Sequence, residues 1–190
     1  MKFDVQAISP TRAASLAASV PSLPRARGDV GLWLAEVQAN RCFVDGTCFV
    51  LERGGETLGY LLGFSRHGHG HCTAVEVVGS APRTSVYLLV RAFMRRLLAI
   101  DVSRAEFSLR DEQEAARTML EALGARNVGQ VHRHPGVEAA GGIFALSMAD
   151  VRYHPFLAAE QSDDSVAVSR VPIPTELGSG ARGGQAFSRS

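Results

Sequence analysis

The sequence has little of the features that mark the more specialised classes of protein. Its three cysteines, at positions 42, 48 and 72, are odd in number and have no CxxC spacing. This pattern argues against a disulfide framework and against a structural zinc site. No apolar run approaches the roughly 18 residues that a membrane-spanning helix needs. The formal net charge of +1 creates no field that would attract nucleic acid or a membrane surface.

A charged and then apolar leader is also missing, and Lys2 is the only lysine. We interpret the excess of arginine as a compositional bias and not as a device for binding anions. Together with the cysteine usage, these absences predict a soluble protein of the reducing cytoplasm that has neither a nucleic-acid nor a membrane partner. At 190 residues, the chain has the length of one ordinary domain.

The clearest helix signal that is present lies between residues 111 and 124. Asp111 and Glu114 have the spacing of a capping box, and Gly124 is the residue type that ends helices in a left-handed conformation. The residues between them predict a helix from about Glu112 to Leu123. Its apolar stripe, at helical spacing, consists of Ala116, Met119, Leu120 and Leu123.

The middle of the chain predicts a hairpin followed by a parallel unit. Two extended segments, 48–53 and 56–65, are joined by Gly54-Gly55, which suits the positive φ angles of a two-residue turn. The next strand is expected at residues 71–80, after a loop rich in Gly and His. A helix then runs to about Ala99, capped by Thr84 or Ser85, and a strand follows at 105–110. This strand–helix–strand order predicts a right-handed crossover.

The remaining elements complete an alternation of strands and helices. We expect a strand at 3–8, helices from Pro10 to about Ser19 and from Asp29 to about Gln38, and antiparallel strands at 127–134 and 141–148. Residues 151–190 lack a sustained period and end rich in Gly, Ser and Arg, which is typical of a mobile tail.

Residues 109–125 resemble the last conserved segment of the GNAT N-acetyltransferase superfamily. In that family V-R-P ends a strand, N-x-x-A starts a helix and L-Y-x-x-x-G-F ends it. Leu109-Arg110 corresponds to V-R, residues 114–117 correspond to the helix start, and residues 123–125 correspond to the stop. Two positions differ, because the family's Asn is Gln113 and its Tyr, often the general acid, is Leu120.

The resemblance implies a fold for residues 1–150. GNAT domains are α/β (α+β) proteins, and this chain is expected to have a mixed central sheet of about seven strands with about four helices. The order of the predicted strands and helices along the chain is that of a complete GNAT domain. Final strands of relatives often pair between subunits, so a homodimer is possible.

The resemblance also implies a co-substrate, acetyl-CoA or another acyl-CoA, and no metal. GNAT proteins bind its diphosphate on a loop written R/Q-x-x-G-x-G/A before a helix, and its pantetheine arm between two parallel strands. A helix N-terminus suits an anion because its N–H groups lack partners. The residues expected to bind the co-substrate here are Val77, Val78, Gly79, Arg83, Thr84, Ser85, Val86, Tyr87 and Gln113.

This loop differs from the family pattern. Ser85 and Tyr87 stand at or beside its glycines, and the tyrosine would obstruct a diphosphate unless its ring points away. Arg83 offers a charged fork in compensation, and Thr84 and Ser85 offer hydroxyl donors. In the alternative interpretation, the two hydroxyls only cap the helix and Arg83 is solvated.

Glu76 is the candidate catalytic base, because some family members keep a base on the strand before the turn. Amine acylation requires removal of an ammonium proton and donors for the oxyanion, for which the N–H groups from Val77 to Gly79 are candidates. A thiol is a fair leaving group unaided, so Leu120 does not rule out transfer. In the alternative interpretation, Glu76 is an edge carboxylate paired with a neighbouring arginine.

The histidines are the last group of candidate residues. His67, His69 and His71 invite a metal-site interpretation, but their alternation with glycine is more typical of a flexible polar turn. His132 and His134 share one strand face and either border a substrate cleft or lie on the surface.

Two functions follow from these patterns and from the resemblance. The first is an acyl-CoA-dependent N-acyltransferase, of N-acetyltransferase type, that acts on a primary amine of a small molecule or peptide. The alternative is a GNAT-fold binding or regulatory module with weakened catalysis, which the altered loop and Leu120 favour.

Overall fold

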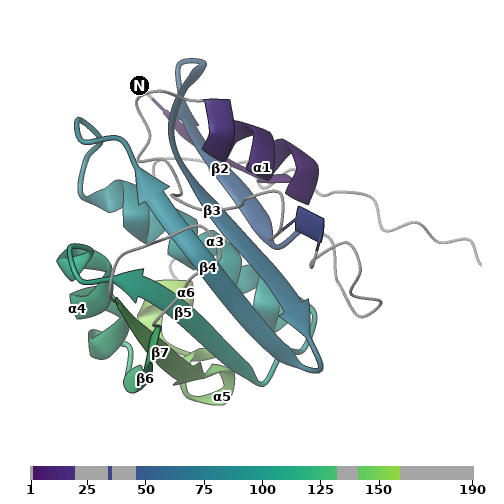
Figure 1. Cartoon of the computed structure of the whole chain (residues 1–190). Coiled ribbons are helices and arrows are strands. Elements are labelled where there is room, and N and C mark those ends of the chain that lie inside the picture. The colour runs from purple at the N-terminus through teal and green to yellow at the C-terminus, as the bar shows by residue number, and fades with distance from the viewer. Residues whose placement is uncertain (1, 20–33, 36–45, 132–140, 159–190) are drawn as a thin grey trace, which may run out of the picture.

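The computed structural model describes residues 2–19, 34–35, 46–131 and 141–158 (Figure 1). Within these ranges, seven strands form one sheet in the order β1-β2-β3-β4-β5-β7-β6. The β4–β5 pair is parallel, and the other neighbours are antiparallel. The strands are β1 (Phe3–Ile8), β2 (Cys48–Arg53), β3 (Glu56–Arg66), β4 (His69–Val77), β5 (Arg104–Arg110), β6 (Arg126–Val131) and β7 (Gly141–Ser147). The predicted α/β class and the mixed seven-stranded sheet are confirmed.

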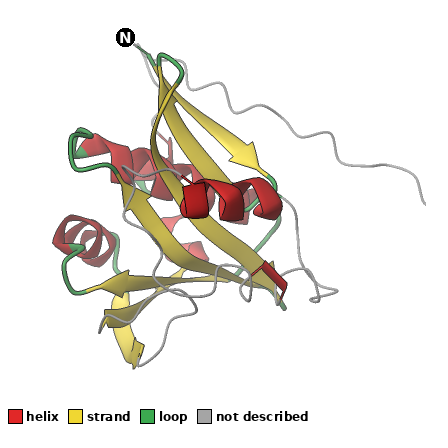
Figure 2. Cartoon of the chain, turned by 45° about the horizontal axis from the view of Figure 1, so that its top comes forward, coloured by secondary structure: helices red, strands yellow, loops and turns green. Residues whose placement is uncertain are grey.

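Helices cover both faces of this sheet. Helix α1 lies over β2 and β3 on one face, and α3 lies on the opposite face (Figures 1 and 2). The described helices are α1 (Pro10–Ser19), α3 (Thr84–Ala99), α4 (Glu114–Ala122), α5 (Met148–Val151) and α6 (Pro155–Ala158). The helix predicted from Asp29 to about Gln38 lies outside the described residues, apart from Leu34 and Ala35.

The core is formed where α3 packs on the sheet. Leu89, Phe93 and Leu97 recur at helical spacing and are fully buried. Two glycines let the helix approach the strands this closely. A Cβ atom at Gly63 would lie 2.6 Å from the Phe93 ring, and one at Gly70 would lie 2.4 Å from a Leu97 methyl group.

Two tight turns fix the register of the central strands. Gly54 and Gly55 have φ angles of 62° and 85°, so the predicted hairpin between β2 and β3 is confirmed. The turn between β3 and β4 consists of His67 and Gly68, with φ angles of 50° and 76°. The predicted loop is therefore shorter than expected, and β4 begins at His69 instead of His71.

Both predicted N-terminal caps are wrong, although both helices are present. Helix α4 begins at Glu114 with Gln113 as its N-cap residue, so Asp111 precedes the helix and forms no capping box. Helix α3 begins at Thr84 after Arg83, and no side chain caps it. The predicted helix stop is confirmed, because Gly124 has a φ angle of +92°.

Beyond β7, the chain continues as packed structure as far as Ala158. Helices α5 and α6 lie against α3, where Val151, Phe156 and Leu157 are buried. The predicted domain boundary at residue 150 stays a prediction. Across the described ranges, no helix has both the length and the apolar character required to cross a membrane.

Candidate functional site

The two parallel strands part halfway along their length. β4 and β5 are paired over four positions, from His69 with Arg104 to Cys72 with Phe107, and the pairing ends there. The register between β3 and β4 shifts at the same level, where Thr73 is the extra residue of a bulge. The Thr73 hydroxyl donates to the Leu62 carbonyl across this shift, at 3.2 Å.

Past the bulge, the edge of β4 that faces β5 has no strand partner among the residues that the structure describes. The Val78 N–H donates to the Leu58 carbonyl of β3 at 2.8 Å. Because backbone groups alternate along a strand, Val75 and Val77 direct theirs to the opposite edge. The backbone donors and acceptors of Val75 and Val77 therefore point into the space between the separated strands.

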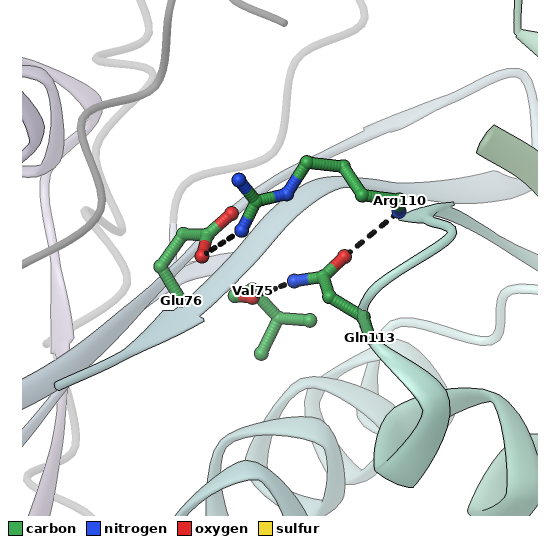
Figure 3. A network of polar contacts seen from close by, with 4 residues as sticks. All are labelled: Val75, Glu76, Arg110 and Gln113. Atoms are coloured by element: carbon green, nitrogen blue, oxygen red, sulfur yellow. Dashed lines mark hydrogen bonds and ion pairs between the residues drawn. The ribbon is translucent and has the colours of Figure 1, made fainter. Parts of the chain in front are cut away.

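A glutamine side chain spans part of this separation (Figure 3). The Gln113 amide nitrogen donates to the Val75 carbonyl at 2.5 Å, and its amide oxygen accepts from the Arg110 N–H at 2.9 Å. Gln113 was predicted to bind the co-substrate, and it lies at the level where the strands are apart. Its side chain connects β4 to the start of α4 instead of capping the helix.

An ion pair spans the same separation. Arg110 Nη2 lies 2.6 Å from Glu76 Oε2 (Figure 3). The Glu76 side chain is only 6% exposed and that of Arg110 is 25% exposed. Burial raises the pKa of the Glu76 carboxyl to about 7, the Arg110 guanidinium opposes the rise, and Glu112 adds to it. The arrangement matches the alternative that Glu76 pairs with an arginine, and it leaves the proposed role as base untested.

The predicted phosphate turn joins β4 to α3. Val78 is buried, Gly79 is exposed, and the Ala81 N–H donates to the Val78 carbonyl at 2.9 Å. Arg83 and Thr84 are exposed at the start of α3. The turn thus brings a guanidinium and a hydroxyl to a helix N-terminus, whose first N–H groups have no intrahelical partners.

The other predicted residues of this turn point to packing. Ser85 is fully buried, and its hydroxyl has no hydrogen-bond partner within the described part of the chain. Val86 and Tyr87 are half-buried against the core. The Tyr87 ring meets the Phe156 ring edge-on, with centroids 4.4 Å apart. The tyrosine that seemed an obstacle therefore helps to hold α6 on α3.

The two faces of β5 have opposite character. Ala105, Phe107 and Leu109 are buried on the face toward α3, where the Phe107 ring lies 5.7 Å from that of Phe93. Period-two alternation puts the intermediate residues on the other face. This polar face of β5 carries Arg104, Glu106, Ser108 and Arg110.

A histidine at the predicted junction of the polar turn and the strand lies on the same polar face. His71 Nδ1 is 3.3 Å from Glu106 Oε2, and Arg104 Nε is 3.0 Å from Glu106 Oε1. The Phe64 ring stacks on the His71 imidazole at a centroid distance of 4.8 Å. The signal that the sequence reasoning missed is the spacing of His69 and His71, which places both on one face of a strand.

Two further side chains at this level are unsuited to catalysis. Leu120, at the position of the family's tyrosine, is fully buried in the core. Cys72 is also buried, and burial raises the pKa of its thiol, so it remains protonated and is a poor nucleophile.

Three further histidines were candidates in the sequence. His67 belongs to the β3–β4 turn, and His132 and His134 lie outside the described residues. In the parts of the chain that the structure describes, no three His, Cys, Asp or Glu side chains are grouped so as to hold a metal ion.

Sequence comparison gives no relatives, because no protein-family model matches the chain and no curated protein is similar to it. Comparison of structures, in contrast, finds proteins of similar fold. The ribosomal-protein-S18-alanine N-acetyltransferase of Escherichia coli has a TM-score of 0.60 and 13% identity, over 77% of this chain and 94% of that one. Ard1 from Thermoplasma volcanium has a TM-score of 0.58 and 12% identity, over 77% and 98%.

A third neighbour carries the co-substrate of this class. A putative acetyltransferase from Salmonella typhimurium, solved with its cofactor acetyl-CoA, has a TM-score of 0.53 and 13% identity, over 78% of this chain and 95% of that one. Identities this low establish a shared architecture and leave the activity open. The chain therefore has the fold of GNAT acetyltransferases, at a sequence identity of 12 to 13% to these three structures.

Proposed function

We propose that the protein is an acyl-CoA-dependent N-acyltransferase, of N-acetyltransferase type, that acylates a primary amine of a small molecule or peptide. The observation that carries the proposal is the end of β4–β5 pairing at Cys72 and Phe107, beside the start of α3. A carrier between the strands would have backbone groups along its length and a helix N-terminus at its phosphate end.

Different residues would bind different parts of the co-substrate. Arg83 and Thr84 would contact the diphosphate, since both are exposed at the start of α3. The backbone groups of Val75 and Val77 would pair with the amides of the pantetheine arm. Gln113 would then exchange its bond to the Val75 carbonyl for one to the arm. This exchange limits the cost of entry, because a new hydrogen bond replaces each one that is broken.

The chemistry needs a base for the ammonium and donors for the oxyanion. Glu76 remains the predicted base, with Arg110 as the group that it would have to release. The Val78 N–H is engaged by Leu58, so the predicted oxyanion donors are reduced to the N–H groups of Val77 and Gly79. These two would serve only a thioester that stops at the level of Glu76, since in a carrier that extends further along β4 the Val77 N–H pairs with the arm.

The second candidate is a GNAT-fold binding or regulatory module without efficient transfer. Two observations favour it: Leu120 is buried where an acid would stand, and side chains already connect the two strands. The two candidates differ in whether an acyl group is transferred.

Thermal unfolding with and without acetyl-CoA tests the proposal. At about 100 times its dissociation constant, a ligand stabilises the folded state by about 2.7 kcal/mol, which raises Tm by roughly 5 to 10 °C for a chain of this length. We expect such a shift, together with release of CoA thiol when an amine is added. The absence of a shift with acetyl-, propionyl- and longer acyl-CoA would favour the second candidate.

A further inference from the structure

The His71–Glu106 pair lies at the point where the two strands part. Its residues face each other across β4 and β5, one position before the last pair, Cys72 with Phe107. The Glu76–Arg110 ion pair lies on the same face of the sheet. It is four residues further along β5, or about 13 Å at about 3.3 Å per residue. One polar pair is therefore at the closed end of the separation, and the other is toward its open end.

A carrier bound in this separation would have its reactive end at the closed end. Its diphosphate would lie at the turn that begins at Val78, and β4 extends six residues back from there to Cys72, about 20 Å at about 3.3 Å per residue. Glu76 stands two residues from the phosphate turn, beside the carrier's arm. His71 stands next to the place that a thioester on an extended arm would reach.

The surroundings of His71 suit a proton acceptor. A carboxylate beside Nδ1 favours the tautomer that carries its proton on this nitrogen, which leaves Nε2 with a lone pair. Glu106 is itself fixed by Arg104 through its second oxygen. The stacked Phe64 ring restricts rotation of the imidazole. With 28% of its side chain exposed, His71 is still accessible from solvent.

We propose that His71, positioned by Glu106, is the general base that accepts the proton of the acceptor ammonium. This inference rests on the proposed function. The ammonium N–H bond breaks toward His71 Nε2, and the free amine forms a bond to the thioester carbon. The C–S bond then breaks with its electron pair on sulfur, and the thiolate takes the remaining amine proton. His71 returns its proton to solvent, so the products are an amide, a thiol and a proton.

Burial, together with most of the neighbouring charges, lowers the pKa of His71 and so favours its neutral form at pH 7. Burial lowers the pKa of His71 from its ordinary value of 6.5, and Glu106 alone among the facing groups opposes this. His69 on β4, Arg66 on β3 and Arg104 on β5 lower the pKa further. A neutral imidazole is the form that accepts a proton.

The test uses ethylamine and trifluoroethylamine as acceptors of similar shape, at high concentration with acetyl-CoA. Ethylamine is protonated at pH 7 and needs a base, whereas fluorination leaves most of the second amine unprotonated. For His71→Gln we expect a loss of about 10²- to 10⁴-fold in kcat with ethylamine and a much smaller loss with trifluoroethylamine. The Tm shift produced by acetyl-CoA is expected to stay at its wild-type size.

Two variants separate a chemical role from a structural one. His67→Asn alters an exposed histidine of the β3–β4 turn that is not among the groups shifting the pKa of His71, and it should leave kcat within about threefold of the wild type. Glu106→Gln removes the carboxylate that raises the pKa of His71, so the acid limb of the pH profile should move to lower pH. A merely structural role for the pair would leave this limb where it is.

The outcomes distinguish the two proposals. Equal losses with both amines in His71→Gln, or an acid limb that survives in this variant, would overturn the assignment of His71 while transfer by the wild type upholds the proposed function. Glu76→Gln, assayed in parallel, would then identify the other candidate base. A wild-type protein that shows no Tm shift with any of the acyl-CoA thioesters and transfers to neither amine would overturn both proposals.

Discussion

The two ends of the β4–β5 pair are connected by different kinds of bond. From His69 to Cys72, backbone hydrogen bonds join the strands, and the register is fixed by the ladder itself. From Val75 onward, side chains span the separation: Gln113 reaches the Val75 carbonyl, and Arg110 reaches Glu76. We refer to these as the paired end and the parted end.

One sheet thereby combines strands that are joined by a backbone ladder with strands that are joined by exchangeable side-chain contacts. A ladder bond is lost only when the strands move, whereas a side-chain bridge can release one partner by rotation of a side chain and accept another. Under the proposed function, the parted end would bind a ligand that enters and leaves, and the paired end would hold His71 in a fixed position. The predictions below alter one end at a time.

The largest effect is expected from Glu76→Gln, which removes the charge at the parted end. The folded state raises the pKa of Glu76 from 4.5 to about 7, so between these values it binds more protons than the unfolded state does. The contribution of Glu76 to the free energy of unfolding is then greatest below pH 4.5 and falls as the pH rises to 7, by up to about 3 kcal/mol.

Urea unfolding of the wild type and the variant at pH 5 and pH 8 measures this dependence. The other titratable groups are the same in both proteins, so their contributions cancel in the difference between the two free energies of unfolding. Relative to Glu76→Gln, the wild type should lose stability between the two pH values. Glu121→Gln, an exposed position on α4, is the matched control. A difference that grows with pH instead would mean that Arg110 holds the pKa of Glu76 below its ordinary value, which would make Glu76 a weak candidate base.

Arg83→Ala, at the start of α3 beside the parted end, should change the free energy of acetyl-CoA binding by a similar or smaller amount. Loss of one charge-assisted hydrogen bond to a phosphate is expected to weaken binding of acetyl-CoA by about 1.5 to 3 kcal/mol. Isothermal titration calorimetry gives this change directly. Arg95→Ala, another exposed arginine of α3, should bind as the wild type does, which separates a specific contact from net charge. Unchanged affinity in Arg83→Ala would exclude Arg83 from the site.

The fold could be predicted well where local pattern decides the structure. The Gly54-Gly55 turn, the β4–α3–β5 crossover and the stop at Gly124 all depend on residues close together in sequence. The caps could not be predicted, because contacts distant in sequence override them. The Gln113 amide bonds a carbonyl 38 residues away, and this fixes the start of α4 where the local pattern favoured Asp111.

The position of the candidate site in the chain could be predicted from the sequence, but most of its side-chain contacts could not. The sequence located the turn from Val77 to Tyr87, because a strand end followed by a helix start has a local signature. It could not indicate that Tyr87 packs on Phe156, or that Arg110 meets Glu76, since these pairs join segments far apart in the chain. His71 was expected where a polar turn passes into a strand, because Gly68 and Gly70 weaken the strand pattern before it.

The smallest effect is expected at the paired end, from Gly70→Ala. The new Cβ atom would lie 2.4 and 2.5 Å from the two Leu97 methyl groups, and Leu97 is fully buried between α3 and the sheet. Since Leu97 has little room to move, we expect a loss of about 1 to 3 kcal/mol in the free energy of unfolding, measured in urea. Gly79→Ala is the control, because nothing lies within 4 Å of a Cβ atom there.

Gly70→Ala also sharpens the contrast between the ends. The strain would fall on the ladder between His69 and Cys72, leaving the bridges at Val75 and Glu76 unaltered. The variant should therefore unfold at lower urea concentration while acetyl-CoA still raises its Tm by the wild-type amount. A Tm shift that shrank along with the stability would mean that the two ends move together, and that the parted end depends on the ladder for its shape.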